Sequence, residues 1–456
     1  MAGIAQTIPT ELLVKIFKLT VPSREEALEF GKMSLNHGSW GLGRVCGRWR
    51  ATVLDMPCMW SDLFISIPTA SAPWINYPIA LLEEQITRGG QHPLRVCLIS
   101  TEVPGYTTAK IFAAIVPSCA RWETLELVSK WLLPTSALLS MRDNIPRLRE
   151  IHISADSTAG FAGQHIFEFA PALRVVRITE PRLHADNRNI NWMSPDYNAN
   201  YNDSFMWPEG PRFDDVFPWG QLTHYESQCM DPYHFDALCQ AENLVVCQAT
   251  VVVENRHFAW RPPTQLVRFT HLQKLTLYAP GPLLDQLVLP ALQDLFIEAA
   301  PSTFHHVVAL LQRSQCSLRK FWMKSHPPPA QYRAILLANP DLVELGIIGR
   351  ESLRHLLGHC TNIDAIVRVL REPLVPRLRA FCIHDQAADL DVPAVLDMVE
   401  ARMAAGLERL CITECEARVF PHAARARALA LKEQGLEVQF KREHERWLAR
   451  GLLEYV

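Results

Sequence analysis

The sequence predicts an α/β protein: two short N-terminal helices followed by a curved solenoid with a parallel sheet. The main observation is a six-residue template (apolar, two variable residues, apolar, one variable residue, apolar) that returns twelve times between Leu94 and Ile412. Amphipathic segments of helical period, such as "TFHHVVALLQR", stand between many copies. Because strand and helix alternate, the strands should run parallel and be joined by right-handed crossovers.

The first sixty residues predict two amphipathic helices. In "IPTELLVKIFKLT", Pro9 suits a first turn, and four bulky apolar residues are expected to share one face. A second helix is expected to carry the apolar stripe Leu42, Val45, Cys46, Trp49 and Val53, and Pro57 should end it. "GSWGLG" at 38–43, between the helices, is interpreted as a flexible linker. About fifty residues are marginal for an independent core, so these faces need a partner or the rest of the chain.

The order of these residues resembles the F-box, whose pattern runs roughly LP-x-E-LL-x-x-IF, then V-C-x-x-W, then P-x-LW. The resemblance covers residues 8–65, with Ile8 in place of the usual Leu and a longer segment between the helices. It implies a Skp-type adaptor, and through it a cullin, as partners. The implied adaptor-binding residues are Pro9, Leu12, Leu13, Ile16, Phe17, Val45, Cys46 and Trp49. The alternative is that both helices simply cap a repeat array.

The template is what a leucine-rich repeat needs, with the last two apolar positions inside a strand and the first packed under the turn before it. The copies begin at Leu94, Trp122, Leu148, Leu173, Leu222, Leu244, Leu272, Leu292, Leu318, Leu342, Leu378 and Leu407, and "WSDLFI" from Trp60 also fits. Their irregular spacing, without a regular asparagine position, resembles the degenerate repeats that follow an F-box. An ordinary α/β domain is the alternative.

Residues 66–440 are expected to form the solenoid. "GLEVQF" at 435–440 should supply a closing strand, and 441–456 should form a capping helix. Residues 180–219 interrupt the repeats with many asparagines and aromatic residues. Since insertions in solenoids often emerge on a binding face, this one is expected to capture substrate. The residues singled out are Trp192, Tyr197, Tyr201 and Trp207.

Composition excludes several classes of protein. The net charge of −3 gives no electrostatic basis for binding nucleic acid or an anionic membrane. The N-terminus lacks the pattern of a signal peptide, and no apolar run reaches membrane-spanning length. The twelve cysteines are scattered through apolar patterns, as expected of reduced core residues in a cytoplasmic or nuclear protein. Cys46 and Cys58 stand too far apart for a zinc motif, and no metal or cofactor is expected.

The sequence contains no complete catalytic motif. His355 and His359 share a helical face, but the glutamate of a zinc protease is missing after the first. Cys411 belongs to a repeat strand, and Asp391 suits a helix N-cap. The expected function is therefore that of a non-catalytic substrate receptor in an SCF-type ubiquitin ligase. Two alternatives stay open: a leucine-rich-repeat scaffold without a ligase role, and a hydrolase embedded in the repeats.

Overall fold

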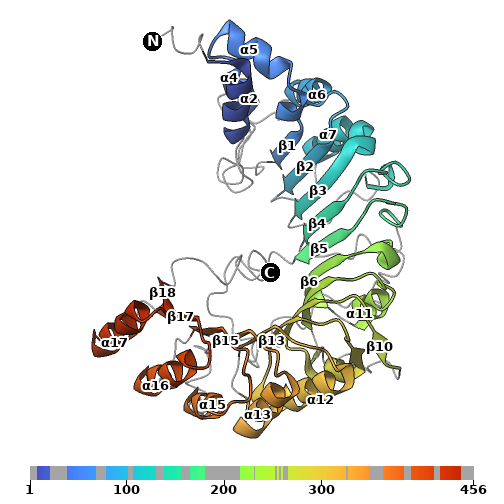
Figure 1. Cartoon of the computed structure of the whole chain (residues 1–456). Coiled ribbons are helices and arrows are strands. Elements are labelled where there is room, and N and C mark those ends of the chain that lie inside the picture. Colours follow the sequence, from blue (N-terminus) through green and yellow to red (C-terminus); the bar gives the residue numbers. More distant parts are fainter. Residues whose placement is uncertain are drawn as a thin grey trace. The chain divides into compact units, whose positions relative to one another are not determined.

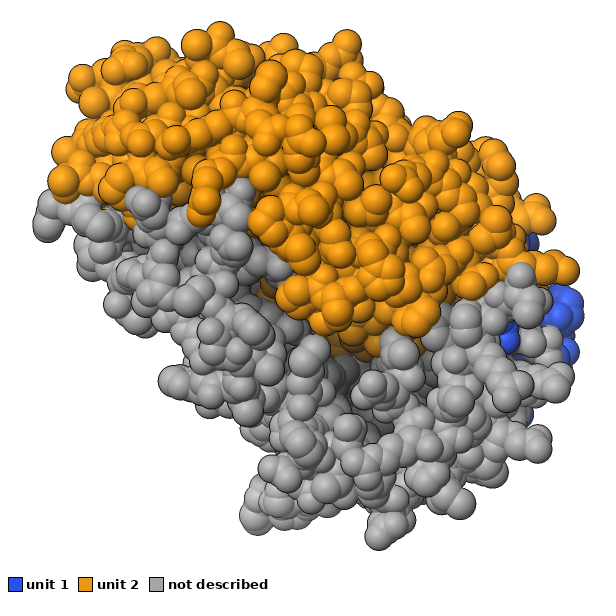
Figure 2. Space-filling model, turned by 90° about the horizontal axis from the view of Figure 1, so that it is seen from below, with its two compact units in different colours: residues 1–188, 203–222, 236–238 blue, residues 189–202, 223–235, 239–456 orange. Residues whose placement is uncertain are grey.

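The protein is described by a computed structural model. It describes residues 8–20, 38–67, 79–100, 106–129, 138–155, 165–179, 216–230, 232–251, 254–255, 258–259, 265–324, 327–348, 363–384, 392–414 and 422–442. The chain divides into two compact units (Figure 2). Unit 1 contains residues 1–188, 203–222 and 236–238, and unit 2 contains residues 189–202, 223–235 and 239–456.

Unit 1 begins with helices and continues as a parallel sheet. Its helical start comprises α2 (Thr10–Leu19), α4 (Gly38–Leu42), α5 (Gly47–Leu54) and the 3-10 turn η1 (Pro57–Trp60). The strands are β1 (Asp62–Ile67), β2 (Leu94–Ser100), β3 (Trp122–Ser129), β4 (Glu150–Ala155) and β5 (Val175–Thr179), in sequence order and parallel. Between them lie α6 (Ile79–Arg88), α7 (Tyr106–Ile115) and η2 (Val116–Arg121), and η4 (Trp219–Gln221) comes later in the chain.

Unit 2 holds a second run of parallel strands in sequence order. These are β6 (His224–Met230), β7 (Val246–Val251), β11 (Lys274–Tyr278), β13 (Asp294–Glu298), β14 (Lys320–Lys324), β15 (Glu344–Ile348), β16 (Ala380–His384), β17 (Arg409–Glu414) and β18 (Glu437–Arg442). Two small pairs accompany them: β8 (Glu254–Asn255) with β9 (Phe258–Ala259), and β10 (Val267–Arg268) with β12 (Leu287–Val288). Two 3-10 turns, η5 (Gly281–Gln286) and η6 (Pro301–Thr303), flank β12 and β13.

Helices connect most strands of the second run. They are α12 (Phe304–Ser314), α13 (Pro329–Ala338), α15 (Ile363–Leu370), α16 (Val392–Met403) and α17 (His422–Glu433), while α11 (Pro232–Leu238) follows β6. From α12 to α17, each helix contacts the one that follows it, and they form one row beside the strands (Figure 1). The α/β class and the parallel sheet with its helices are therefore confirmed.

The repeat template coincides with the strands. In β11 the last two apolar positions, Leu275 and Leu277, are buried, and Leu272 packs just before the strand. The same holds for the copies at Leu292, Leu318, Leu342, Leu378 and Leu407. Alternate strand residues point to opposite faces, so the fourth and sixth template positions meet in one core. The expectation of one parallel sheet in sequence order for these six strands is confirmed, and β18 is the expected closing strand.

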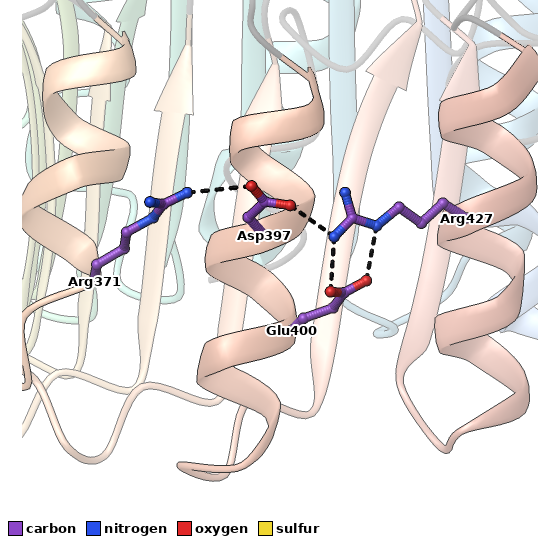
Figure 3. Close-up of polar contacts among 4 residues, drawn as sticks. All are labelled: Arg371, Asp397, Glu400 and Arg427. Carbon is purple, nitrogen blue, oxygen red and sulfur yellow. Dashed lines mark hydrogen bonds and ion pairs between the residues drawn. The ribbon is translucent and has the colours of Figure 1, made fainter.

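Ion pairs join neighbouring helices of the row. The carboxylate of Asp397 on α16 lies 3.5 Å from Arg371 Nη2. It also accepts a hydrogen bond from Arg427 Nη2 of α17 at 2.7 Å (Figure 3). Glu400 accepts Arg427 Nε at 2.8 Å and Nη2 at 2.7 Å. The buried Arg402 of α16 donates hydrogen bonds to three backbone carbonyls at and just after the end of α15: Leu370, Glu372 and Val375. These contacts bridge successive helices of the row.

Two local expectations were wrong in the N-terminal region. The helix expected through residues 42–53 is interrupted, since α4 ends at Leu42 and α5 begins at Gly47. Cys46 is fully extended, with φ −160° and ψ 169°, and acts as the N-cap position of α5. The supposed linker 38–43 contains α4 because Ser39 Oγ bonds the Met59 carbonyl and Trp40 packs on the neighbouring core.

Two segment boundaries also differ. The end of the 180–219 insertion belongs to the core, because Phe217 and Trp219 are buried and Phe217 stacks on Phe167 with 5.7 Å between ring centroids. Strand β18 continues to Arg442, two residues into the expected capping helix. The rest of that expected helix and several singled-out residues lie outside the described residues: Trp192, Tyr197, Tyr201, Trp207, His355, His359 and Asp391.

Candidate functional site

Helix α2 has two apolar faces instead of the single face expected. Leu13 and Phe17 are completely buried, whereas Leu12 and Ile16 are 49% and 39% exposed. Successive helical residues are separated by about 100°, so Leu12 and Leu13 cannot both lie at the centre of one face. Leu19 extends the outer face and is 85% exposed. We call Leu12, Ile16 and Leu19 the outer α2 stripe.

The inner face of α2 is anchored in a core of its own. The ring of Phe17 meets Trp49 of α5 edge-on, with 5.0 Å between centroids. Val53, Met59 and Trp60 complete the buried cluster. Trp60 donates its indole N–H to the Val53 carbonyl at 2.9 Å, so this large side chain is satisfied where it is buried. Two of the predicted adaptor-binding residues, Leu13 and Phe17, therefore hold α2 in place, and Trp49 packs against the same cluster.

A polar contact ties the beginning of α2 to α5. Arg48 Nη2 donates to the Ile8 carbonyl at 2.5 Å and approaches Thr10 Oγ1 at 3.4 Å. Pro9 occupies the N-cap position of α2 and is exposed. Val45, just before α5, is 57% exposed, and Cys46 is half-buried. The predicted adaptor-binding residues thus separate into an internal group and an outward-facing group.

The outer α2 stripe has the form of a docking surface and not of a reaction centre. Its residues recur at i, i+4 and i+7, so their side chains line one edge of a two-turn surface. Lys15 and Lys18 are exposed on the same helix. An apolar helical edge of this kind fits an apolar groove, which is a common mode of peptide and helix recognition. Aliphatic side chains supply no acid, base or nucleophile.

A second row of aligned side chains lies on the strands of unit 2, and Phe296, Cys382 and Cys411 in it are buried. The fifth template position points away from the core formed by the fourth and sixth, and in register it contributes Thr276, Phe296, Trp322, Gly346, Cys382 and Cys411. Trp322 lies flat over Gly346 and donates its indole N–H to Glu344 Oε1 at 2.9 Å. On β11 and β13, the ring centroids of Tyr278 and Phe296 are 5.5 Å apart. The template's fifth position is the sequence signal that could have located this row.

Electrostatics on this face favour neutral aromatic and thiol groups. Burial, with the carboxylates of Glu298 and Glu226 adding to it, raises the pKa of Tyr278 to about 12. The pKa of the Cys382 thiol is raised, first by its hydrogen bond with Cys411 on the adjacent strand and then by burial. A protonated thiol is a poor nucleophile and a poor metal ligand. Cys411 is a buried strand residue, as expected.

No cluster of three or more His, Cys, Asp or Glu suited to a metal ion occurs in the described part of the chain. Among the same residues, no helix is both long and apolar enough to cross a membrane. Comparison with protein-family models gave no match, and comparison with curated proteins found no similar sequence.

Proposed function

We propose that this chain is a substrate receptor of an SCF-type cullin-RING ubiquitin ligase. Its N-terminal helices, which resemble an F-box, would bind a Skp-type adaptor. Its repeats, a curved leucine-rich-repeat-like solenoid, would hold the protein to be ubiquitinated. The chain itself would catalyse nothing; it would raise the effective concentration of substrate near the conjugating enzyme.

The observation that carries this proposal is the pair of faces on α2. Leu13 and Phe17 fix the helix from inside, so the exposed Leu12 and Ile16 are presented on a rigid element. Exposed large aliphatic residues in a stripe are typical of a partner-binding surface. Two lysines, Lys15 and Lys18, are exposed on the same helix, together with Glu11. An adaptor with an apolar groove and acidic surroundings would complement it.

The first prediction concerns the stripe. Replacing Leu12 and Ile16 together by Ala should lower the affinity of the full chain for a purified Skp-type adaptor at least tenfold, because interface anchors contribute about 1–2 kcal/mol each. The change should leave the fold intact, since both side chains are outside the core. Binding can be measured by titration calorimetry.

A matched control is available in unit 2. Leu337 on α13 and Leu429 on α17 are 54% and 47% exposed, so their replacement by Ala removes a comparable amount of exposed apolar surface. Adaptor affinity should not change in this control. Equal affinity for the wild-type chain and the Leu12/Ile16 variant would refute the assignment of the stripe. Absence of adaptor binding by the wild-type chain would instead favour an interaction scaffold without a ligase role.

A further inference from the structure

Arg88, the last residue of α6, lies between two tryptophan rings of the N-terminal helical region. Its guanidinium carbon is 4.6 Å from the ring centroid of Trp40 and 4.6 Å from that of Trp60. The two rings meet edge-on, with centroids 5.0 Å apart and planes at 84°. Glu84, one turn earlier on α6, accepts Arg88 Nε at 2.8 Å. One cation therefore contacts both rings and is oriented by its own helix.

The two rings belong to the helical cluster that carries α2. Trp60 is 1% exposed and lies in the same core as Leu13 and Phe17, and Trp40 packs against that core from α4. The indole N–H of Trp40 is buried, and no acceptor is found for it among the described residues. The ring of Trp40 is therefore held by ring contacts, including the one with Arg88, while the neighbouring Ser39 hydroxyl donates to the Met59 carbonyl.

Helix α6 is fixed to the sheet independently of Arg88. Gln85 Nε2 donates to the Asp62 carbonyl in β1 at 2.9 Å. Arg121, at the end of η2, donates to the Ile86 carbonyl at 3.1 Å, and Leu82 is buried. Loss of the Arg88 side chain would leave these contacts in place. The residue thus lies at the junction between a helix held by the repeats and the cluster that displays the outer α2 stripe.

We propose that Arg88 is a positioning residue that fixes the orientation of the N-terminal helices on the first strands of the repeat sheet. Its contact with Trp40 and Trp60 makes the helical cluster and the β1–α6 region move as one body. This positional role stands on the structure alone. Its consequence for ubiquitin transfer rests on the proposed function, because transfer needs a defined distance between the adaptor side and the acceptor lysine.

Hydrogen exchange on the full chain tests the positional role directly. In Arg88→Gln, the amides of α4 and α5 should exchange about tenfold faster, because both tryptophan rings lose the cation that packs on them. Arg88→Lys keeps the charge but loses the planar group, so the exchange rates of these amides should lie between those of Arg88→Gln and the wild type. Glu84→Gln is the matched control, because it removes the carboxylate charge but keeps an oxygen that can accept Arg88 Nε, and its exchange should match the wild type.

Two results would overturn the positional role. The first is unchanged exchange of α4 and α5 in Arg88→Gln. The second is faster exchange throughout β2, β3 and β4 in the same variant, which would mean that Arg88 maintains the repeat sheet and not the orientation of the helices. Strand amides of unit 1 therefore serve as the internal reference.

A second measurement tests the consequence. In a ligase reconstituted from the full chain, a Skp-type adaptor, a cullin and its RING subunit, Arg88→Gln should bind adaptor with unchanged affinity. Its autoubiquitination rate should fall severalfold. A parallel loss of adaptor affinity would place Arg88 in the adaptor surface, and an unchanged rate would show that its position does not affect transfer. Either result would overturn the proposed consequence for transfer. If the wild-type chain bound no adaptor, the proposed function would fail while the exchange result remained a separate test.

Discussion

At the scale of single residues, Gly346 shows how closely the side chains at the fifth template position are packed in unit 2. A Cβ atom at this position would overlap the six-membered ring of Trp322, which lies flat over the strand. Gly346→Ala should therefore displace Trp322 and destabilise unit 2 by about 1–3 kcal/mol, the usual cost of overpacking. Urea unfolding followed by circular dichroism measures the difference.

The control for this prediction is another glycine. At Gly47 an added Cβ would meet no atom within 4 Å, so Gly47→Ala should leave stability nearly unchanged or raise it slightly. In a Trp322→Leu background the effect of Gly346→Ala should shrink, because the overlapping ring is gone. Equal effects in both backgrounds would show that Trp322 does not restrict this position.

The stability of the folded chain should depend on pH through Tyr278. Burial raises the pKa of this phenol from 10.0 to about 12. Below pH 10 the phenol is neutral in both the folded and the unfolded chain, so its contribution to stability is fully present. Between pH 10 and 12 only the unfolded chain ionises, and that contribution is lost.

The thermal midpoint of the wild-type chain should therefore fall more steeply between pH 10 and 11.5 than that of Tyr278→Phe. Scanning calorimetry at a series of pH values measures both slopes. Cys247, whose pKa burial also raises to about 12, is present in both proteins and cancels in the comparison. Identical slopes would mean that Tyr278 ionises in the folded chain as readily as in water.

At the scale of elements, α2 allows two adjacent leucines to be compared on one helix. Leu13→Ala should destabilise the N-terminal cluster by about 2–5 kcal/mol because it opens a cavity beside Phe17. Leu12→Ala should change that stability by less than about 0.5 kcal/mol because the side chain is half exposed. Native-state hydrogen exchange of α5 amides reports the free energy of opening in each variant. A similar loss in both would contradict the two-faced helix.

The element scale also shows where sequence reasoning reaches its limit. Helical periodicity correctly placed α2, but a stripe of four apolar residues could not reveal that Leu12 and Ile16 face outward while Leu13 and Phe17 face inward. That division depends on which neighbouring helix packs against α2. The interruption before α5 was missed for a related reason, because apolar spacing continues through an extended residue such as Cys46.

At the scale of the whole molecule, the strand pattern was the most predictable feature. Every copy of the template coincides with a strand, because period-two alternation and burial act locally on six residues. The expectation for residues 180–219 failed at its end, where Phe217 and Trp219 enter the core. Aromatic composition suits both a recognition loop and a packed core, so it could not separate the two.

Adaptor binding by the chain is the central claim, and one measurement tests it most directly: the equilibrium affinity of the purified full chain for a purified Skp-type adaptor at moderate ionic strength. We expect a saturable one-to-one complex with a Kd of about 1 µM or tighter, the range of specific interfaces. The affinity should fall modestly as salt screens the charges of Lys15 and Lys18 beside the outer α2 stripe. Absence of a complex at adaptor concentrations of about 100 µM, with the chain fully folded, would contradict the account.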